Sequence, residues 1–234
     1  MASITEFAPQ STQTATRFNL YQAVHKGLRA MLADLLLNVG RSDGHNAEDS
    51  ARRLAQLQQV LQLCRCHLQH EEQHLHRAME ARAPGSSADR DAEHQHHLAE
   101  IAALQQQATA LAALPAQAQP TAWQLLYGRL SLFVADNFVH MLQEEQANMA
   151  VLWAHYSDAE LIELHDVLVA GIAPEEMAHW FRWIVPHIAH GERVAMFAGM
   201  RQGMPPDIFA QTLAQAGSLL PTQDWCQLQQ ALAA

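Results

Sequence analysis

Cysteine, glycine and proline are all scarce in this chain, and each shortage excludes a class of structure. Three cysteines in 234 residues cannot build the disulfide framework of a small secreted protein, and two of them stand together as Cys64-Arg-Cys66. Ten glycines and nine prolines leave long tracts of Ala, Leu, Gln and Glu uninterrupted. Such tracts are typical of helices and argue against a sheet.

Basic residues and long apolar runs are also few. The 14 Lys and Arg stand against 24 Asp and Glu, so the formal net charge is −10, which argues against a nucleic-acid-binding surface. No apolar run reaches the about 18 residues of a membrane span. The first residues lack the basic and apolar regions of a signal peptide. We therefore expect a cytoplasmic protein with neither a membrane nor a nucleic-acid partner.

Hydrophobic residues make up 49% of the chain, enough for a substantial core, and their periodicity predicts an all-α protein. Four long helices are expected, at about residues 17–38, 47–83, 89–114 and 122–155. Because short links join these amphipathic helices, neighbouring helices are expected to be antiparallel. The predicted fold is an up-down-up-down four-helix bundle over residues 17–156.

The two ends of the chain show other patterns. Residues 1–16 lack periodicity and are predicted to form a flexible arm. Residues 157–234 contain several shorter helical patterns, with expected starts near Pro174, Pro205 and Pro221. We expect this C-terminal extension to pack on the bundle as an appendix of shorter helices. It is also the candidate surface for a homodimer or a protein partner.

Histidine is abundant: the chain contains 15, one more than Lys and Arg together. Read at alternating steps of three and four residues, each long helix has an apolar stripe interrupted by a polar patch that contains histidine. The polar residues of these stripes are His25 in the first helix, His67 and Glu71 in the second, His94 and His97 in the third, and His140 and Glu144 in the fourth.

The four patches are expected to lie at the same height in the bundle. With antiparallel helices and a rise of about 1.5 Å per residue, all four fall about 10–20 Å from the same end. Buried imidazoles and carboxylates are costly unless they are paired or bind a metal. A single histidine in a stripe is more often an ordinary core residue, but four patches in register predict a metal site.

The spacing His-x3-Glu puts both groups on one helix face, one turn apart, so both can reach one ion. Two such pairs lie in the apolar stripes: His67–Glu71 and His140–Glu144. Two others share their stripes with glutamine or glutamate and are predicted to be solvated: His76–Glu80 and His96–Glu100. Three neighbours have open roles. Tyr21 is expected to serve in packing or to hydrogen-bond to the site, and His70 and His74 to be partly exposed, to bind the metal or to hydrogen-bond to its ligands.

Four segments, taken in order, resemble the hemerythrin-like (HHE cation-binding) domain family over about residues 17–155. They are Tyr21-Gln-Ala-Val-His25, His67-Leu-Gln-His70-Glu71-Glu72, Glu93-His94-Gln-His96-His97 and His140-Met-Leu-Gln-Glu144-Glu145. The resemblance implies a non-haem di-iron centre with histidines and bridging carboxylates in a four-helix bundle, which binds O2 or responds to it. It implies as ligands His25, His67, Glu71, His97, His140 and Glu144, with His94 as a rival or partner to His97.

The sequence also departs from the oxygen-carrying members of that family. Those proteins use His-x3-His in the third helix and His-x4-Asp in the fourth. Here Glu93 stands four residues before His97, and the fourth helix offers His140-x3-Glu144. A second carboxylate makes the site more anionic, which favours oxidised iron over reversible oxygen carriage.

Three functions fit these observations. The first is a protein with two iron ions that binds or responds to O2, nitric oxide or peroxide, and it is favoured over a dedicated enzyme. The second is a di-iron oxidase or peroxide-consuming enzyme, which needs a substrate pocket beside the metal. The third is a metal-poor bundle with a structural or interaction role.

Overall fold

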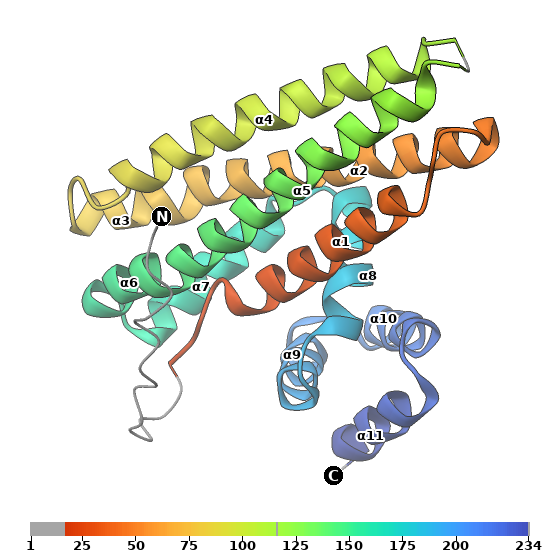
Figure 1. Ribbon diagram of the computed structural model, residues 1–234. Helices are drawn as coiled ribbons and strands as arrows, with labels where there is room; N and C mark the ends of the chain where they lie inside the picture. Colours follow the sequence, from red (N-terminus) through yellow and green to blue (C-terminus); the bar gives the residue numbers. More distant parts are fainter. Residues whose placement is uncertain (1–16, 116, 234) are drawn as a thin grey trace, which may run out of the picture.

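The computed structural model describes residues 17–115 and 117–233, which are helical apart from short connections (Figure 1). The all-α prediction is confirmed for these residues, which contain no strand. The predicted arm at residues 1–16 lies outside the described residues. None of the described helices is both long and apolar enough to cross a membrane. The cytoplasmic location stays a prediction.

Four long helical segments lie side by side and enclose the main core (Figure 1). They are α1 (Gln22–Gly40), α2 with its continuations η2 and α3 (Ala47–His70, Glu71–His76, Arg77–Arg82), α4 (Ala88–Ala112), and α5 with η3 and α6 (Gln119–Gln143, Glu144–Asn148, Met149–His155). The helix α1 contacts α2 and α5, and α4 contacts the same two helices. The core between them is built from residues such as Leu32, Leu57, Leu104, Leu126 and Leu130, all fully buried.

The first helix begins at Gln22, five residues later than the predicted start at Arg17. The side chain of Asn19 accepts hydrogen bonds from the backbone N–H groups of Tyr21 and Gln22, so these groups need no helical partner. The Arg17 side chain is also engaged elsewhere, because it donates to the backbone carbonyl of Tyr156. The chain before α1 is therefore held by side-chain hydrogen bonds instead of by a further helical turn.

Two π-helical segments interrupt the long helices, and each shifts the buried stripe by one residue. A π turn contains one residue more than an α turn. In the second segment the predicted stripe continued through His74, whereas the structure buries Leu75 and His76 instead. In the fourth it continued through Ala147, whereas Asn148 is buried. The prediction that His76 is solvated was therefore wrong, because it assumed an unbroken α-helix.

Residues 157–233 form five shorter helices, of which one begins at a predicted proline and two begin at the residue that follows one. These helices are α7 (Asp158–Ala170), α8 (Pro174–His187), α9 (His190–Gly203), α10 (Pro206–Leu219) and α11 (Thr222–Ala233). The helix α8 lies against α1, and its Trp180 joins the main core. Helices α9, α10 and α11 share a second core with α8 around Val185, Phe197 and Leu228. The boundary between bundle and extension at residue 156 stays a prediction.

The contact between α1 and α8 depends on Gly27. A Cβ atom added at Gly27 would lie 2.9 Å from the side chain of Ile184 and 3.2 Å from its backbone. We therefore expect Gly27→Ala to lower the free energy of unfolding by about 1–3 kcal/mol, measured by urea titration, because the two helices must move apart. A Cβ added at Gly199, within α9, would point into open space, so Gly199 offers a control. Gly199→Ala should stabilise the helix by about 0.5–1 kcal/mol. Equal gains from both substitutions would show that α8 is not closely packed on α1.

Candidate metal centre

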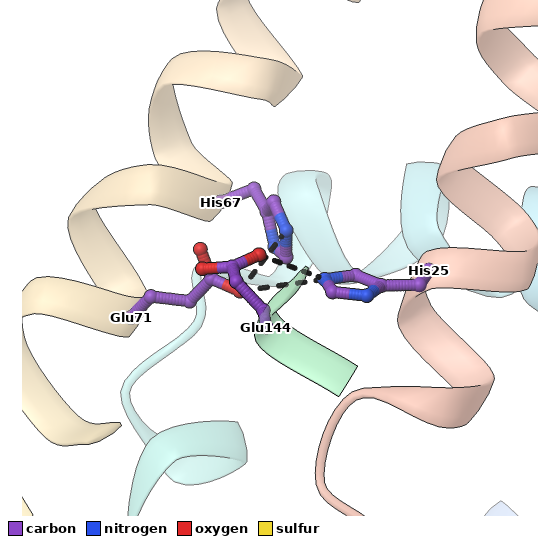
Figure 2. A group of neighbouring side chains, drawn as sticks. All are labelled: His25, His67, Glu71 and Glu144. Atoms are coloured by element: carbon purple, nitrogen blue, oxygen red, sulfur yellow. Dashed lines mark ion pairs between the residues drawn. The ribbon is translucent and has the colours of Figure 1, made fainter. Parts of the chain in front are cut away.

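Six of the seven predicted ligand residues converge in the bundle core. They come from all four long segments: His25 from α1, His67 from the last turn of α2, His94 from α4, His140 from the end of α5, and Glu71 and Glu144 from the first positions of η2 and η3. None is more than 6% exposed. Figure 2 shows His25, His67, Glu71 and Glu144 pointing toward one another from three directions.

The converging side chains form two overlapping groups. One contains His25 and His67, the other contains His94 and His140, and both contain Glu71 and Glu144. Within each group the four donor atoms lie within 4.8 Å of one another, close enough to hold one metal ion. Because both carboxylates belong to both groups, the arrangement has the layout of two adjacent ion sites that share two carboxylates.

The distances place each carboxylate between the two pairs of imidazoles. Glu71 Oε1 lies 3.2 Å from His67 Nε2 and 3.5 Å from His25 Nε2, while its Oε2 lies 3.6 Å from His94 Nε2. Glu144 Oε2 lies 3.4 Å from His140 Nε2 and 3.5 Å from His25 Nε2. Its other oxygen, Oε1, lies 3.4 Å from His94 Nε2. The two oxygens of each carboxylate therefore face different imidazoles.

Many polar atoms of this cluster are buried without a hydrogen-bond partner. Among the described residues they are His25 Nε2, His67 Nε2, His140 Nε2, Glu144 Oε2 and both carboxylate oxygens of Glu71. A buried polar atom without a partner costs about 1–3 kcal/mol, so several in one place are not stable without compensation. All of them are nitrogen or carboxylate oxygen atoms that can bind a transition metal. The residues present therefore fit a metal ion.

An outer ring of carboxylates orients the histidines. His25 Nδ1 lies 3.0 Å from Glu145, His94 Nδ1 lies 3.2 Å from Glu72, and His140 Nδ1 lies 2.8 Å from Glu93. When Nδ1 donates a proton to a carboxylate, Nε2 is left free to bind a metal, an arrangement common around metal-binding histidines.

Sequence reasoning did not assign this role to Glu72, Glu93 or Glu145. A signal was present in the repeated Glu-Glu pairs at 71–72 and 144–145. The first member of each pair enters the core, and the second reaches a histidine on a neighbouring helix.

The cluster strongly perturbs the acidity of its members. Burial opposes the charge on His25, but the carboxylates of Glu145 and Glu71 raise its pKa to about 9. Burial and the charge of Glu144 raise the pKa of Glu71. For Glu144, burial is outweighed by the hydrogen bond from His94 and the charge of His140, so its pKa is lowered. Without a metal, protons shared among these groups must balance the buried negative charge.

The seventh predicted ligand, His97, is buried but belongs to neither donor group. Its ring lies 4.6 Å from that of His140, and its Nδ1 is 3.4 Å from the side-chain nitrogen of Asn137. Between the two rivals in the third long helix, His94 is the residue whose ring nitrogen faces both carboxylates. His97 instead supports the ring of His140.

Three further residues were predicted to lie beside the ligands, and the structure places them differently: Tyr21, His70 and His74. The Tyr21 ring lies 5.0 Å from the His25 ring, and its hydroxyl accepts a hydrogen bond from Asn148. His70 belongs to neither donor group and lies 3.0 Å from Glu176 of α8. His74 is partly exposed and joins neither donor group. Of the three, only Tyr21 borders the cluster.

The extension supplies one wall of the site, which the sequence did not indicate. The ring of Trp180 on α8 lies 6.0 Å from the ring of His67. Its indole N–H donates to Glu176, which also faces His70. This network fixes α8 beside the cluster and helps to exclude water from His67.

Comparison with known proteins gave one family match. The family described as "Hemerythrin HHE cation binding domain" matches residues 16–152, more than half of the chain and all of the converging residues. No curated protein and no solved structure matches the chain.

The histidines of the cluster predict how the stability of the metal-free protein depends on pH. Burial together with neighbouring histidines lowers the pKa of His97 and that of His140 to about 4. Between about pH 6.5 and 4 the unfolded chain therefore binds more protons, so stability falls as the pH falls. The raised pKa of His25 acts in the opposite direction, and its contribution is lost as the pH rises toward about 9.

We therefore expect the urea midpoint of chelator-treated protein to be highest near neutral pH and to decline on both sides. His97→Gln should reduce the decline between pH 6.5 and 4.5, because this residue then no longer titrates in the unfolded chain. A midpoint that stays level or rises over this acidic range would contradict the assigned burial of these imidazoles.

Proposed function

We propose that this chain, which belongs to the hemerythrin HHE cation-binding domain family, holds two iron ions between Glu71 and Glu144. The observation that supports the proposal is the sharing of both carboxylates by two donor groups. His25 and His67 would hold one ion, and His94 and His140 the other. We further propose that the bundle is of the up-down-up-down type, as the contacts among α1, α2, α4 and α5 suggest.

The donor set favours iron over other common metals. Imidazole suits iron, zinc and copper, whereas carboxylates suit harder cations, and a mixed set with two carboxylates is typical of non-haem iron. Metal sites of this composition are built in the cores of helical bundles, with glutamates from facing helices. The absence of cysteine from both donor groups argues against a structural zinc site.

We propose that the centre binds or responds to a small ligand: O2, nitric oxide or a peroxide. When bound, iron supplies open coordination positions and electron transfer. The surrounding residues restrict what can approach, because every donor residue is at most 6% exposed. Tyr21 and Trp180 close the neighbourhood of His25 and His67. This enclosure favours a ligand of two or a few atoms over an organic substrate, and so favours sensing or scavenging over an oxidase.

Metal analysis tests the proposed ligands. We expect the purified protein to contain iron, up to two ions per chain, and Glu71→Ala or Glu144→Ala to reduce that content. Glu100 is the matched control, because it also follows a histidine by four residues but forms an ion pair with Arg129 on the bundle surface. Glu100→Ala should leave the iron content unchanged. Equal losses in all three variants would contradict the assignment.

Iron should also stabilise the folded protein. A ligand that binds only the folded state adds about 2.7 kcal/mol when present at 100 times its Kd. Chelator should therefore lower the melting temperature of the wild type, and added ferrous iron should restore it. In Glu144→Ala both changes should be smaller. A melting temperature that ignores chelator and iron alike would favour a metal-poor structural bundle.

Exposure to air distinguishes a reversible carrier from a sensor or scavenger. Two shared carboxylates stabilise the higher charge of oxidised iron, so we expect anaerobically reduced protein to change its optical spectrum in air and to keep that change under vacuum. A spectrum that returns under vacuum and changes again in air would identify a reversible oxygen carrier.

A further inference from the structure

The outer face of α5 carries a row of exposed apolar residues that no other described helix covers. Leu125, Leu132 and Val139 follow one another at intervals of seven residues and are 66%, 74% and 51% exposed. Gly128 and Ala135 lie between them, also exposed, and complete the spacing of three and four residues that keeps one line along a helix. We refer to these five residues as the α5 stripe.

This stripe is separate from the metal centre and from the main core. The inner face of α5 carries Leu126, Leu130, Phe133 and His140, which are all buried. The helix is therefore apolar on two opposite faces, a pattern expected when both faces are covered. In Figure 1 α8 lies against α1, and none of the described helices α7 to α11 packs closely on α5. Single exposed leucines are ordinary on protein surfaces, but a continuous heptad row is not.

We propose that the α5 stripe binds the α5 stripe of a second copy of this chain, with the two helices antiparallel. In an antiparallel pair of heptad helices, the first apolar position of each heptad faces the second apolar position of the partner. Leu132 then faces the partner's Ala135, and Val139 faces the partner's Gly128. At these two positions a large side chain thus meets a small one. Leu125 at the end of the stripe faces the partner's Leu142, which is half-buried in its own chain.

Two charged residues beside the stripe favour this antiparallel alignment over shifted ones. Arg129 and Asp136 lie one heptad apart on the side of α5 that faces α4, where they contact Glu100 and His96. In the proposed pairing, Arg129 lies next to the partner's Asp136, and the symmetric contact forms as well. A shift by one heptad in either direction would instead oppose Arg129 with the partner's Arg129, or Asp136 with the partner's Asp136. Such like-charge contacts are unfavourable.

A parallel pair lacks this complementarity. The positions that flank the stripe on its other side are Gln124, Ser131 and Phe138. In a parallel arrangement these residues, which carry no charge, would face Arg129 and Asp136. Both the alternation of large and small residues and the placement of charge therefore favour the antiparallel copy as the occupant.

The oligomeric state of the full chain tests the inference. A single helix pair buries less than the about 800 Å² per partner of a standard interface, so we expect a dimer whose population rises with concentration. Sedimentation equilibrium of the wild type should show this rise over a series reaching several hundred micromolar. A wild type that remains monomeric throughout would overturn the proposal.

A charge placed in the stripe should prevent pairing without unfolding the chain. Leu132→Glu puts two carboxylates close together at the centre of the interface, so the dimer dissociation constant should rise by about tenfold or more. Because Leu132 is 74% exposed, the variant should keep the helix content and the iron content of the wild type. Val167→Glu on α7 is the control: Val167 is 57% exposed and lies outside the stripe, so dimerisation should persist. A Leu132→Glu variant that still dimerises would place the interface elsewhere and overturn the proposal.

Cysteine cross-linking tests the orientation. In a background with Cys66→Ser and Cys226→Ser, copies carrying Leu125→Cys are mixed with copies carrying Leu142→Cys under mild oxidation. The antiparallel pairing predicts disulfides only between unlike copies, since like positions are separated by about 17 residues, or about 26 Å. Disulfides between two Leu125→Cys copies would show a parallel pair and would overturn the proposed arrangement. Metal loading does not enter this test, so its outcome is independent of the proposed function.

Discussion

The fold must accommodate two carboxylates in the centre of a helical core. Glu71 and Glu144 are at most 3% exposed, and their negative charges cannot be solvated by water. Four imidazoles face them, and Glu72, Glu93 and Glu145 hold three of these rings from behind. Although burial opposes a charge on His25, the carboxylates of Glu145 and Glu71 raise its pKa to about 9, whereas burial lowers the pKa of His140 to about 4. Geometry and acidity both fit a core that is completed by positively charged ions.

The two π-helical segments occur at the residues that carry the buried negative charge. Each begins at one of the two shared glutamates, on helices that face each other across the core. Each also changes which residues are buried in the following turn, and so brings His76 and Asn148 inward. Asn148 then donates to the hydroxyl of Tyr21, beside the cluster. Such bulges often occur at functional sites, because they present a side chain that a regular helix would place elsewhere.

The converging residues were largely predictable from the sequence, whereas their surroundings were not. Helical periodicity placed His25, His67 and His140 on inward faces correctly, because α1, α2 and α5 are regular up to those residues. It failed for His76, since a π turn leaves no signature in the spacing of apolar residues. It could not choose between His94 and His97, both of which are buried. The contribution of Trp180 depends on how α8 folds back on α1, a long-range contact that local patterns do not encode.

Both α1 and α5 carry an apolar face on the side that points away from the bundle core. Among the described residues, only the outer face of α1 is covered by another helix. A helix in a four-helix bundle needs a single apolar stripe, so a second apolar face requires a second partner. For α1 that partner is α8, whose Ile184 fits closely over Gly27. For α5 the described residues provide no equivalent cover over Leu132. A prediction that assigns a single apolar stripe to each helix misses this second apolar face of α5. The helix that positions His140 and Glu144 inside the bundle would then also join two copies of the protein through its opposite side.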